Sequence, residues 1–425
     1  MNIYISGISG TGMGPLALMA HDAGLTVCGS DLKKGAIYDE LIEAGIEVEI
    51  GEQSGEFLRV KLKEGVDWFV HTSALPEDHA ELKLARESGI KVTKRDDFTA
   101  FLIEKLGLKM VAVAGTHGKT TTTAMIVWAA LKLGLPVSYI VGTTLGFAPS
   151  GAYHSGDKFF VYEADEYDRN FLKFYPWLAE IPAVSYDHPD IYPTREDYES
   201  AFFEFRKQSE NAIEYVANGI MNNGQKSDLF TVDDFKLAGA ARRVDAALAA
   251  EAVYMMVQKN GVKENSSYDF HGLIDILNEF PGIGRRFERI MDGLYSDYAH
   301  HPDEIKATID VAKDEARLRG KKGIVVVYQP HQNTRQHEVR DEYPDAFCGA
   351  EKVLWLPTYL TREDPSLPVI SAEEFVTQLD GIDAEAVLLN DDLKMQIRKF
   401  LDGGLLVVLM TAGPADEWLR ENFAK

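Results

Sequence analysis

Short apolar segments alternate with segments of helical spacing through most of this chain, and this alternation constrains the fold more than any other feature. Asn2–Ser6 is a strand-like run that leads through a glycine-rich loop into the helical pattern of Pro15–Ala23. Lys109–Ala114 leads in the same way into Thr121–Leu133. Alternation of this kind predicts mostly parallel sheets with helices on both faces, which is an α/β fold.

The expected domain division follows the points where this pattern restarts or breaks. A chain of 425 residues exceeds one domain of roughly 150 residues. The pattern restarts at Lys109, and the Pro and Gly residues of Pro281–Gly284 interrupt both strand and helix patterns. We expect three domains: Rossmann-like over 1–107, central with a phosphate-binding loop over 108–284, and Rossmann-like over 285–425.

Composition excludes some classes of partner. The chain has 44 Lys and Arg against 67 Asp and Glu, a net charge of −23. Nucleic-acid binding needs a basic footprint, so we expect no nucleic-acid partner. No apolar run approaches the ~18 to 20 residues of a membrane span, and we see no secretion signal. With only two cysteines, Cys28 and Cys348, these features predict a cytoplasmic location and leave the oligomeric state open.

The strongest local signal is the glycine loop between the second strand-like run and its helix. Glycines let backbone N–H groups point inward, and the helix N-terminus favours an anion. A lysine and a threonine at the end of such a loop suit a triphosphate and Mg²⁺. The alternative is a glycine turn with an exposed lysine. The predicted triphosphate-binding residues are Gly115, Thr116, His117, Gly118, Lys119, Thr120 and Thr121.

The earlier loop, Gly7–Gly12, is a weaker signal for a nucleotide. It joins a strand to a helix without the G-x-G-x-x-G order, and Asp31 ends the next strand where a ribose contact would lie. The loop supports a nucleotide or UDP site, and tight strand–helix packing is the alternative. A nicotinamide-dependent dehydrogenase would also use such a loop, but it would leave the second loop without a function.

Acidic residues follow the phosphate loop at expected strand ends. Glu163–Asp168 comes directly after the strand-like run Phe159–Tyr162, and Asp187 and His188 follow an expected strand over Ala183–Ser185. Strand ends of a parallel sheet line the ligand crevice. The sequence therefore predicts a Mg²⁺ pocket of carboxylate, imidazole and threonine hydroxyl. A solvated acidic loop and a turn are the alternatives.

Two arginines in the last third of the chain suit carboxylate or phosphate groups. Arg286 and Arg335 carry the planar guanidinium that matches these anions. His300 and His301 are disfavoured as a transition-metal pair, because adjacent side chains point apart and no ligand spacing follows.

Taken together and in this order, the motifs resemble the Mur ligase family. They are GISGTGMG with GSD, GTHGKTTT, EADEYD, DHPDIY, FPGIGRRFE, DYAHHPDEIKATI and QPHQNTR, with Thr411–Gly413 near the end. The resemblance implies a UDP-binding domain, an ATPase domain and a C-terminal domain that closes over the substrate. The implied reaction joins the carboxylate of UDP-N-acetylmuramate to the amino group of L-alanine while ATP becomes ADP and phosphate.

The resemblance also implies residue roles. Lys119, Glu163, His188 and His300 would serve catalysis, with Thr120, Glu163 and His188 as ligands of two Mg²⁺ ions. Arg286 would contact ATP, the cosubstrate. The implied UDP-sugar residues are Gly7, Ser9, Gly10, Thr11, Gly12, Met13, Ser30, Asp31 and Ser73. The implied residues for the amino acid and the acyl intermediate are Tyr298, His300, Gln332 and Arg335.

The chain departs from the family pattern at several positions. The stretch 217–235 is much shorter than in the family, so the β-rich part of the central domain looks shortened. Gln332 stands where the family usually has Arg, which affects contact with the amino-acid carboxylate. The family segment that touches adenine appears here as Gly239–Asp245, so Arg242 or Arg243 would have to take part. Some relatives carry a carbamylated lysine after the Asp-His pair; 189–206 contains no lysine, so we expect none.

Two other functions stay open. A sister group of the family adds L-Ala-γ-D-Glu-meso-diaminopimelate to the same UDP sugar, and Glu163–Asp168, Ala299 and Asn333–Thr334 favour it. In contrast, Gln329–His331, Arg335 and Ala412–Gly413 favour L-alanine. The altered Gly239–Asp245 segment instead favours a non-catalytic regulator that binds a UDP sugar.

Overall fold

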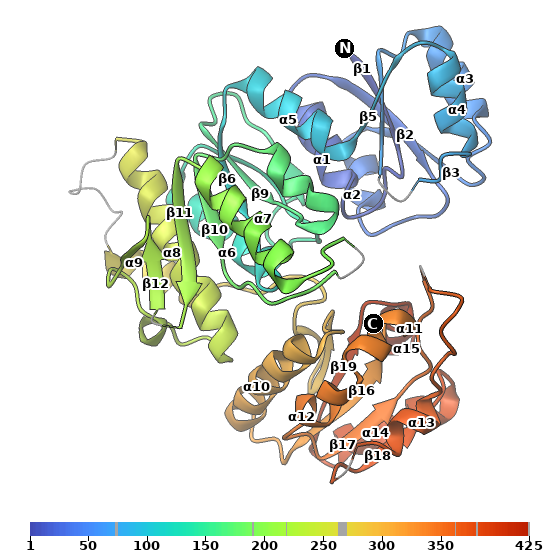
Figure 1. The fold of residues 1–425 in the computed structure, drawn as a ribbon, viewed down its shortest axis with the longest axis vertical. Coiled ribbons are helices and arrows are strands. Elements are labelled where there is room, and N and C mark those ends of the chain that lie inside the picture. The colour runs from blue at the N-terminus through green and yellow to red at the C-terminus, as the bar shows by residue number, and fades with distance from the viewer. Residues whose placement is uncertain are drawn as a thin grey trace. The chain divides into compact units, whose positions relative to one another are not determined.

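The computed structural model describes residues 1–72, 75–188, 191–217, 219–261, 270–361, 363–379 and 381–423. Its strands form three sheets with helices around them (Figure 1), which confirms the predicted α/β class and three-sheet architecture. By Cα proximity the chain forms two compact units. The first comprises Met1–Phe235 and Val244–Pro281, and the second comprises Lys236–Arg243 and Gly282–Lys425. The three-domain division by residue number stays a prediction.

The N-terminal sheet is fully parallel, in the order β3-β2-β1-β4-β5. All its carboxyl ends therefore meet at one edge, where the first glycine loop leaves β1. The strands are β1 Asn2–Ser6, β2 Thr26–Asp31, β3 Glu47–Ile50, β4 Trp68–His71 and β5 Lys91–Lys94. The helices are α1 Gly14–Asp22, α2 Tyr38–Glu43, α3 Glu56–Glu64, α4 Ala80–Glu87 and α5 Arg95–Leu106.

The central sheet has the order β13-β12-β11-β10-β6-β9-β7-β8. Its inner strands are parallel, but β8, β12 and β13 are antiparallel to their neighbours, so this sheet is mixed. The strands are β6 Lys109–Val113, β7 Val137–Ile140, β8 Gly151–Ala152, β9 Phe159–Glu163, β10 Leu178–Ile181, β11 Asn211–Val216, β12 Gly219–Asn222 and β13 Gln225–Lys226. The helices are α6 Lys119–Leu133, α7 Arg195–Gln208, α8 Ala240–Lys259 and α9 Phe270–Asn278.

One predicted strand of this sheet is wrong. The sequence predicts a strand over Ala183–Ser185, whereas the strand is β10 and ends at Ile181. Pro182 follows, and a proline has no N–H to donate to the ladder, so pairing stops there.

The C-terminal sheet has the order β14-β15-β19-β16-β17-β18, and only β14 is antiparallel. The strands are β14 Glu288–Met291, β15 Leu294–Asp297, β16 Ile324–Gln329, β17 Lys352–Trp355, β18 Ala384–Ala386 and β19 Leu406–Thr411. The helices are α10 Pro302–Leu318, α11 Asn333–Glu338, α12 Tyr343–Ala346, α13 Ala372–Val376, α14 Asp391–Asp402 and α15 Ala415–Phe423.

One buried core joins the first two sheets. It runs from Ile3 and Leu16 near the N-terminus to Ala112 and Phe160 of the central sheet. Gly151 of β8 lies so close to α1 that a Cβ there would stand 2.1 Å from Pro15 O. This continuous apolar packing explains why the two sheets form one compact unit. In the described part of the chain, no helix combines the length and the apolar character that crossing a bilayer requires.

Candidate active site

The first glycine loop, between β1 and α1, is fastened to the end of β2. The Ser9 backbone N–H and hydroxyl both donate to Asp31 Oδ2, at 3.0 and 2.8 Å. The Gly35 N–H donates to Ser9 Oγ at 2.9 Å, so this hydroxyl links two loops. The geometry assigns a structural role to one oxygen of Asp31, which the sequence analysis expects to contact a ribose.

A buried carboxylate lies behind this loop. Ser30 Oγ and Ser6 Oγ donate to Glu81, at 2.7 and 2.7 Å, and Tyr4 Oη donates to it at 2.6 Å. Ser30 is only 2 % exposed, so its hydroxyl is committed to Glu81 in this structure. Ser73, another predicted UDP-sugar residue, lies outside the described residues.

The second glycine loop joins β6 to α6, and two of its glycines have no room for a side chain. Gly115 has φ +156°, and a Cβ there would lie 2.8 Å from Ala183 O. Gly118 has φ +84°, and a Cβ there would lie 2.6 Å from Asp245 Oδ1 and 3.0 Å from Pro182 Cβ. Only glycine fits both the backbone conformation and the space.

Thr116 ties this loop to the segment after β10. Its N–H donates to Ala183 O at 2.9 Å, and its hydroxyl lies 2.6 Å from Ser185 O and 2.8 Å from Tyr198 Oη. The segment that the sequence analysis expects to be a strand therefore supports the loop instead. Half-buried His117 is the next loop residue.

The glycine requirement gives a testable prediction. We expect Gly118→Ala to weaken ATP binding at least about tenfold, which is a loss of roughly 1.4 kcal/mol, because the loop must move away from Asp245 and Pro182. Gly134→Ala is the matched control: Gly134 ends the same helix with φ +65° and has nothing within 4 Å of a Cβ. Both variants should lose about 1 kcal/mol of stability from backbone strain. ATP titration separates them, and equal affinities in the two variants would refute the steric argument.

Lys119 is the cation of the loop, and it pairs with a buried acid. Its Nζ donates to Gly115 O at 2.5 Å and to Glu166 Oε1 at 2.9 Å. Burial alone would lower the pKa of Lys119, but Glu166, followed by Asp165 and Glu163, raises it. The ammonium therefore stays charged in a site surrounded by acids.

Thr120 and Glu163 meet at the start of α6 and the end of β9. The Thr120 hydroxyl donates to Glu163 Oε1 at 3.1 Å. Glu163 Oε2 is buried and has no hydrogen-bond partner among the described residues. Hydroxyl and carboxylate oxygens are the ligands that Mg²⁺ prefers, so these two residues fit this ion. The structure thus brings together two of the three predicted metal ligands.

His188, the third, lies beside other acids of the same region. Its Nε2 is 3.6 Å from Asp187 Oδ2 and 3.8 Å from Glu166 Oε1. Its backbone has φ +58°, an uncommon conformation for a residue with a side chain. Strain of this kind clusters at functional sites.

The second unit brings together three predicted acceptor residues around one that the sequence analysis missed. The rings of Tyr298 and His300 lie 5.6 Å apart, and those of His300 and His331 lie 5.5 Å apart. Arg335 Nη1 donates to His331 Nδ1 at 3.4 Å. His300 also pairs with Glu304, with 3.2 Å between Nδ1 and Oε2. This row of aromatic, imidazole and guanidinium groups can bind an amino-acid carboxylate.

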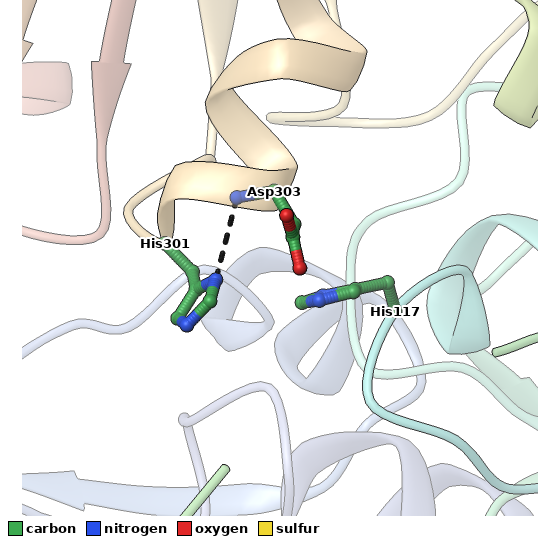
Figure 2. A group of neighbouring side chains, drawn as sticks. All are labelled: His117, His301 and Asp303. Atoms are coloured by element: carbon green, nitrogen blue, oxygen red, sulfur yellow. Dashed lines mark hydrogen bonds between the residues drawn. The ribbon is translucent and has the colours of Figure 1, made fainter. Parts of the chain in front are cut away.

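Arg286, predicted to contact ATP, lies at the margin of this row. Its guanidinium is 5.2 Å from the Tyr298 ring centroid, and its Nη1 is 4.0 Å from Glu304 Oε1. The neighbouring His301 has a structural role: it precedes α10, and the Asp303 N–H donates to its Nδ1 at 3.4 Å (Figure 2).

Gln332 has an unusual backbone just before α11. Its φ and ψ are +69° and 122°, and its N–H donates to Tyr359 O at 3.0 Å. A non-glycine residue held in this region is strained, and such strain requires support from its surroundings.

The segment that replaces the family's adenine motif is occupied by protein contacts. The Gly239 N–H donates to Asp314 Oδ2 at 3.0 Å, and Arg243 Nη1 donates to Leu237 O at 3.0 Å. Arg243 also pairs with Asp314 at 3.7 Å. Asp245 accepts a hydrogen bond from the Thr122 hydroxyl at 3.2 Å, next to the second glycine loop.

Fold and site define a class: an α/β protein in which a glycine loop of the phosphate-binding type lies next to a carboxylate and a hydroxyl that suit Mg²⁺. The model for the Mur ligase family, catalytic domain, matches residues 2–105, and that for the Mur ligase middle domain matches 113–270. A UDP-N-acetylmuramate–L-alanine ligase of Syntrophomonas wolfei is 30% identical over 98% of this chain and 95% of its own length.

Two solved structures share the fold. The UDP-N-acetylmuramate–alanine ligase of Thermotoga maritima has a TM-score of 0.76 at 23% identity, covering 99% of this chain and 98% of its own. The murein peptide ligase of Psychrobacter arcticus has a TM-score of 0.62 at 21% identity over the same shares. This chain belongs to the Mur ligase family. It is therefore an ATP-dependent amide ligase of peptidoglycan precursor synthesis, in a family that uses ATP and Mg²⁺.

Sequence reasoning missed two residues of these clusters. Glu166 lies in the acidic stretch that the sequence analysis singled out, but nothing in the spacing shows that it pairs with Lys119, 47 positions away. His331 lies within the QPHQNTR motif and contacts residues on both sides of the row. The sequence signal for both is a polar side chain inside a recognised motif, EADEYD for Glu166 and QPHQNTR for His331.

Proposed function

We propose that this chain joins L-alanine to the carboxylate of UDP-N-acetylmuramate. A carboxylate oxygen attacks the γ-phosphorus of ATP, the bond to the β–γ bridging oxygen breaks, and ADP leaves. The amino group then attacks the acyl carbon, phosphate leaves with the C–O bond electrons, and the nitrogen loses a proton. The product is an amide.

The observation that carries the proposal is the position of the Lys119 ammonium at the end of the second glycine loop. A point charge there offsets the negative charge that develops as the phosphoryl group is transferred. Two Mg²⁺ ions, held by Thr120, Glu163 and His188, would supply further charge neutralisation. Gly115–Thr121 would bind the triphosphate, and Arg286 would contact ATP.

The acceptor assignment rests on the second unit and on the relatives. Tyr298, His300, Gln332 and Arg335 would orient L-alanine, with the Arg335 guanidinium facing its carboxylate. A curated relative matched over nearly its full length is named as an L-alanine ligase. The first glycine loop would hold the UDP part of the other substrate.

A phosphate-release assay tests this function directly. UDP-N-acetylmuramate, ATP and Mg²⁺ are combined with either L-alanine or L-Ala-γ-D-Glu-meso-diaminopimelate. We expect turnover with L-alanine and little with the tripeptide. Turnover with the tripeptide but not with L-alanine would show that the tripeptide is the acceptor. Binding of the UDP sugar with no turnover for either acceptor would indicate a regulator.

A further inference from the structure

The first glycine loop uses most of its backbone N–H groups within the protein. The amides that donate to protein acceptors are those of Gly7, Ile8, Ser9, Gly10, Met13 and Gly14. Within the described part of the chain, the amides of Thr11 and Gly12 donate to no protein acceptor. These two adjacent donors are therefore the ones that the loop can offer to a ligand.

A guanidinium lies against the same two residues. Arg95 begins α5, at the carboxyl edge of the N-terminal sheet. A Cβ on Gly12 would lie 3.1 Å from Arg95 Nη1, so the absence of a side chain at Gly12 lets the guanidinium approach the loop. The Arg95 side chain is 24% exposed, which leaves part of it open to a ligand.

The orientation of Arg95 is set by a buried acid. Its Nε donates to Asp96 Oδ1 at 3.0 Å, and the same oxygen accepts from Tyr162 Oη at 2.9 Å. Both Asp96 and Tyr162 are 2% exposed, and Tyr162 belongs to β9 of the central sheet. The two terminal amino groups of Arg95 donate no hydrogen bond to any described residue. The guanidinium is thus held at Nε, with its terminal donors available.

The available donors of Arg95, Thr11 and Gly12 suit the oxygens of a phosphate group. Two terminal amino groups of arginine present parallel N–H bonds that match two oxygens of one phosphate. Backbone amides at the start of a helix favour the same group. A structural ion pair alone would explain the Arg95–Asp96 contact. It would not explain why the terminal amino groups of Arg95 lie beside the Thr11 and Gly12 amides, none of which donates to a described residue.

We propose that the Arg95 guanidinium, together with the Thr11 and Gly12 amides, binds the diphosphate of the nucleotide sugar. This inference rests on the proposed function for the identity of the sugar nucleotide. Because Asp96 also accepts from Tyr162, the position of Arg95 depends on contact between the N-terminal and central sheets. Arg95 therefore adds a predicted UDP-sugar residue that lies outside the glycine loop.

The test is direct binding to the full-length chain by calorimetry. The ligands are UDP-N-acetylmuramate, UDP and uridine, which lacks the diphosphate. We expect Arg95→Ala to raise the Kd for UDP-N-acetylmuramate and UDP by about 10- to 100-fold and to leave the Kd for uridine unchanged. Arg95→Lys should recover part of the loss, since it keeps a charge but not the paired donors. Arg86→Ala is the control, because Arg86 is an exposed arginine of the same sheet region, on α4, and pairs with Glu77.

The outcomes separate the possible roles. A loss for UDP-N-acetylmuramate with no loss for UDP would place Arg95 at the sugar carboxylate and overturn the inference. An equal loss for uridine, or no loss for any ligand, would assign Arg95 a structural role only. Failure of the wild-type chain to bind UDP would also overturn the inference about Arg95. If UDP binding follows the expected pattern but L-alanine supports no phosphate release, the acceptor proposal fails while the role of Arg95 stands.

Discussion

Replacing Lys119 with alanine is expected to lower turnover by about a thousandfold. Its ammonium is the positive charge of the second glycine loop, and it lies 2.9 Å from Glu166 and 2.5 Å from Gly115 O. Without it, the charge on the transferring phosphoryl group loses a preorganised partner, so the rate of the chemical step falls more than the affinity for ATP. The measurement is kcat for phosphate release with saturating ATP, Mg²⁺, UDP-N-acetylmuramate and L-alanine.

Two further variants keep this prediction free of folding artefacts. Lys119→Ala leaves the buried Glu166 without its ion pair, which itself destabilises the protein. Lys119→Arg keeps a positive charge beside Glu166 but replaces the compact ammonium, so it should fold and still lose turnover. Lys132→Ala removes an exposed lysine from the other end of the same helix and should leave kcat unchanged. Full turnover in a folded Lys119→Arg variant would contradict the assigned role.

Replacing Glu180 with glutamine is expected to stabilise the protein at neutral pH. Glu180 lies in the middle of β10, fully buried, and neither carboxylate oxygen has a hydrogen-bond partner among the described residues. Burial, reinforced by Asp245 and Glu251 nearby, raises the pKa of Glu180 well above its ordinary value of 4.5. The carboxyl group is therefore held in its neutral form in the folded chain.

The sign of the pH dependence follows from linkage. Above pH 4.5 the unfolded chain loses the Glu180 proton while the folded chain keeps it, so rising pH favours unfolding until the folded pKa is passed. The slope is about 1.4 kcal/mol per pH unit. From pH 5 upward, as far as the folded pKa, the wild type should therefore lose stability relative to Glu180→Gln.

Urea unfolding of both proteins at pH 5 and pH 7 measures this difference. Glu204→Gln is the control, because Glu204 is an exposed glutamate on α7 and should add no difference between the two pH values. A Glu180→Gln variant with the same pH dependence as the wild type would show that the buried carboxyl group is ionised in the folded state. Activity should be little changed, because among the described residues the Glu180 side chain makes no hydrogen bond to the second glycine loop. Only its backbone carbonyl bonds nearby, accepting from the N–H of Ala114, just before the loop.

The same residue shows why one strand was misplaced. A glutamate in the middle of a buried strand breaks the apolar pattern, so the pattern favours the apolar residues after Pro182 over Leu178–Ile181. Protonation of Glu180 avoids burying a charge, and a hydrophobicity pattern, which treats glutamate as charged, does not show this. The mixed character of the central sheet was missed for a related reason, because a two-residue strand such as β8 leaves no periodic signal.

The sequence by itself determined the α/β class and the position of the second glycine loop. It also placed the acidic segment that begins at Glu163, because glycines, a lysine and strand-end acids at short spacing constrain the backbone locally. Only the tertiary structure decided which acid pairs with Lys119, which loop amides stay available and that Arg95 lies beside Gly12. Those partners are 47 and 83 positions apart. Contacts at such separations arise from the order in which strands pair, and no local spacing in the sequence records that order.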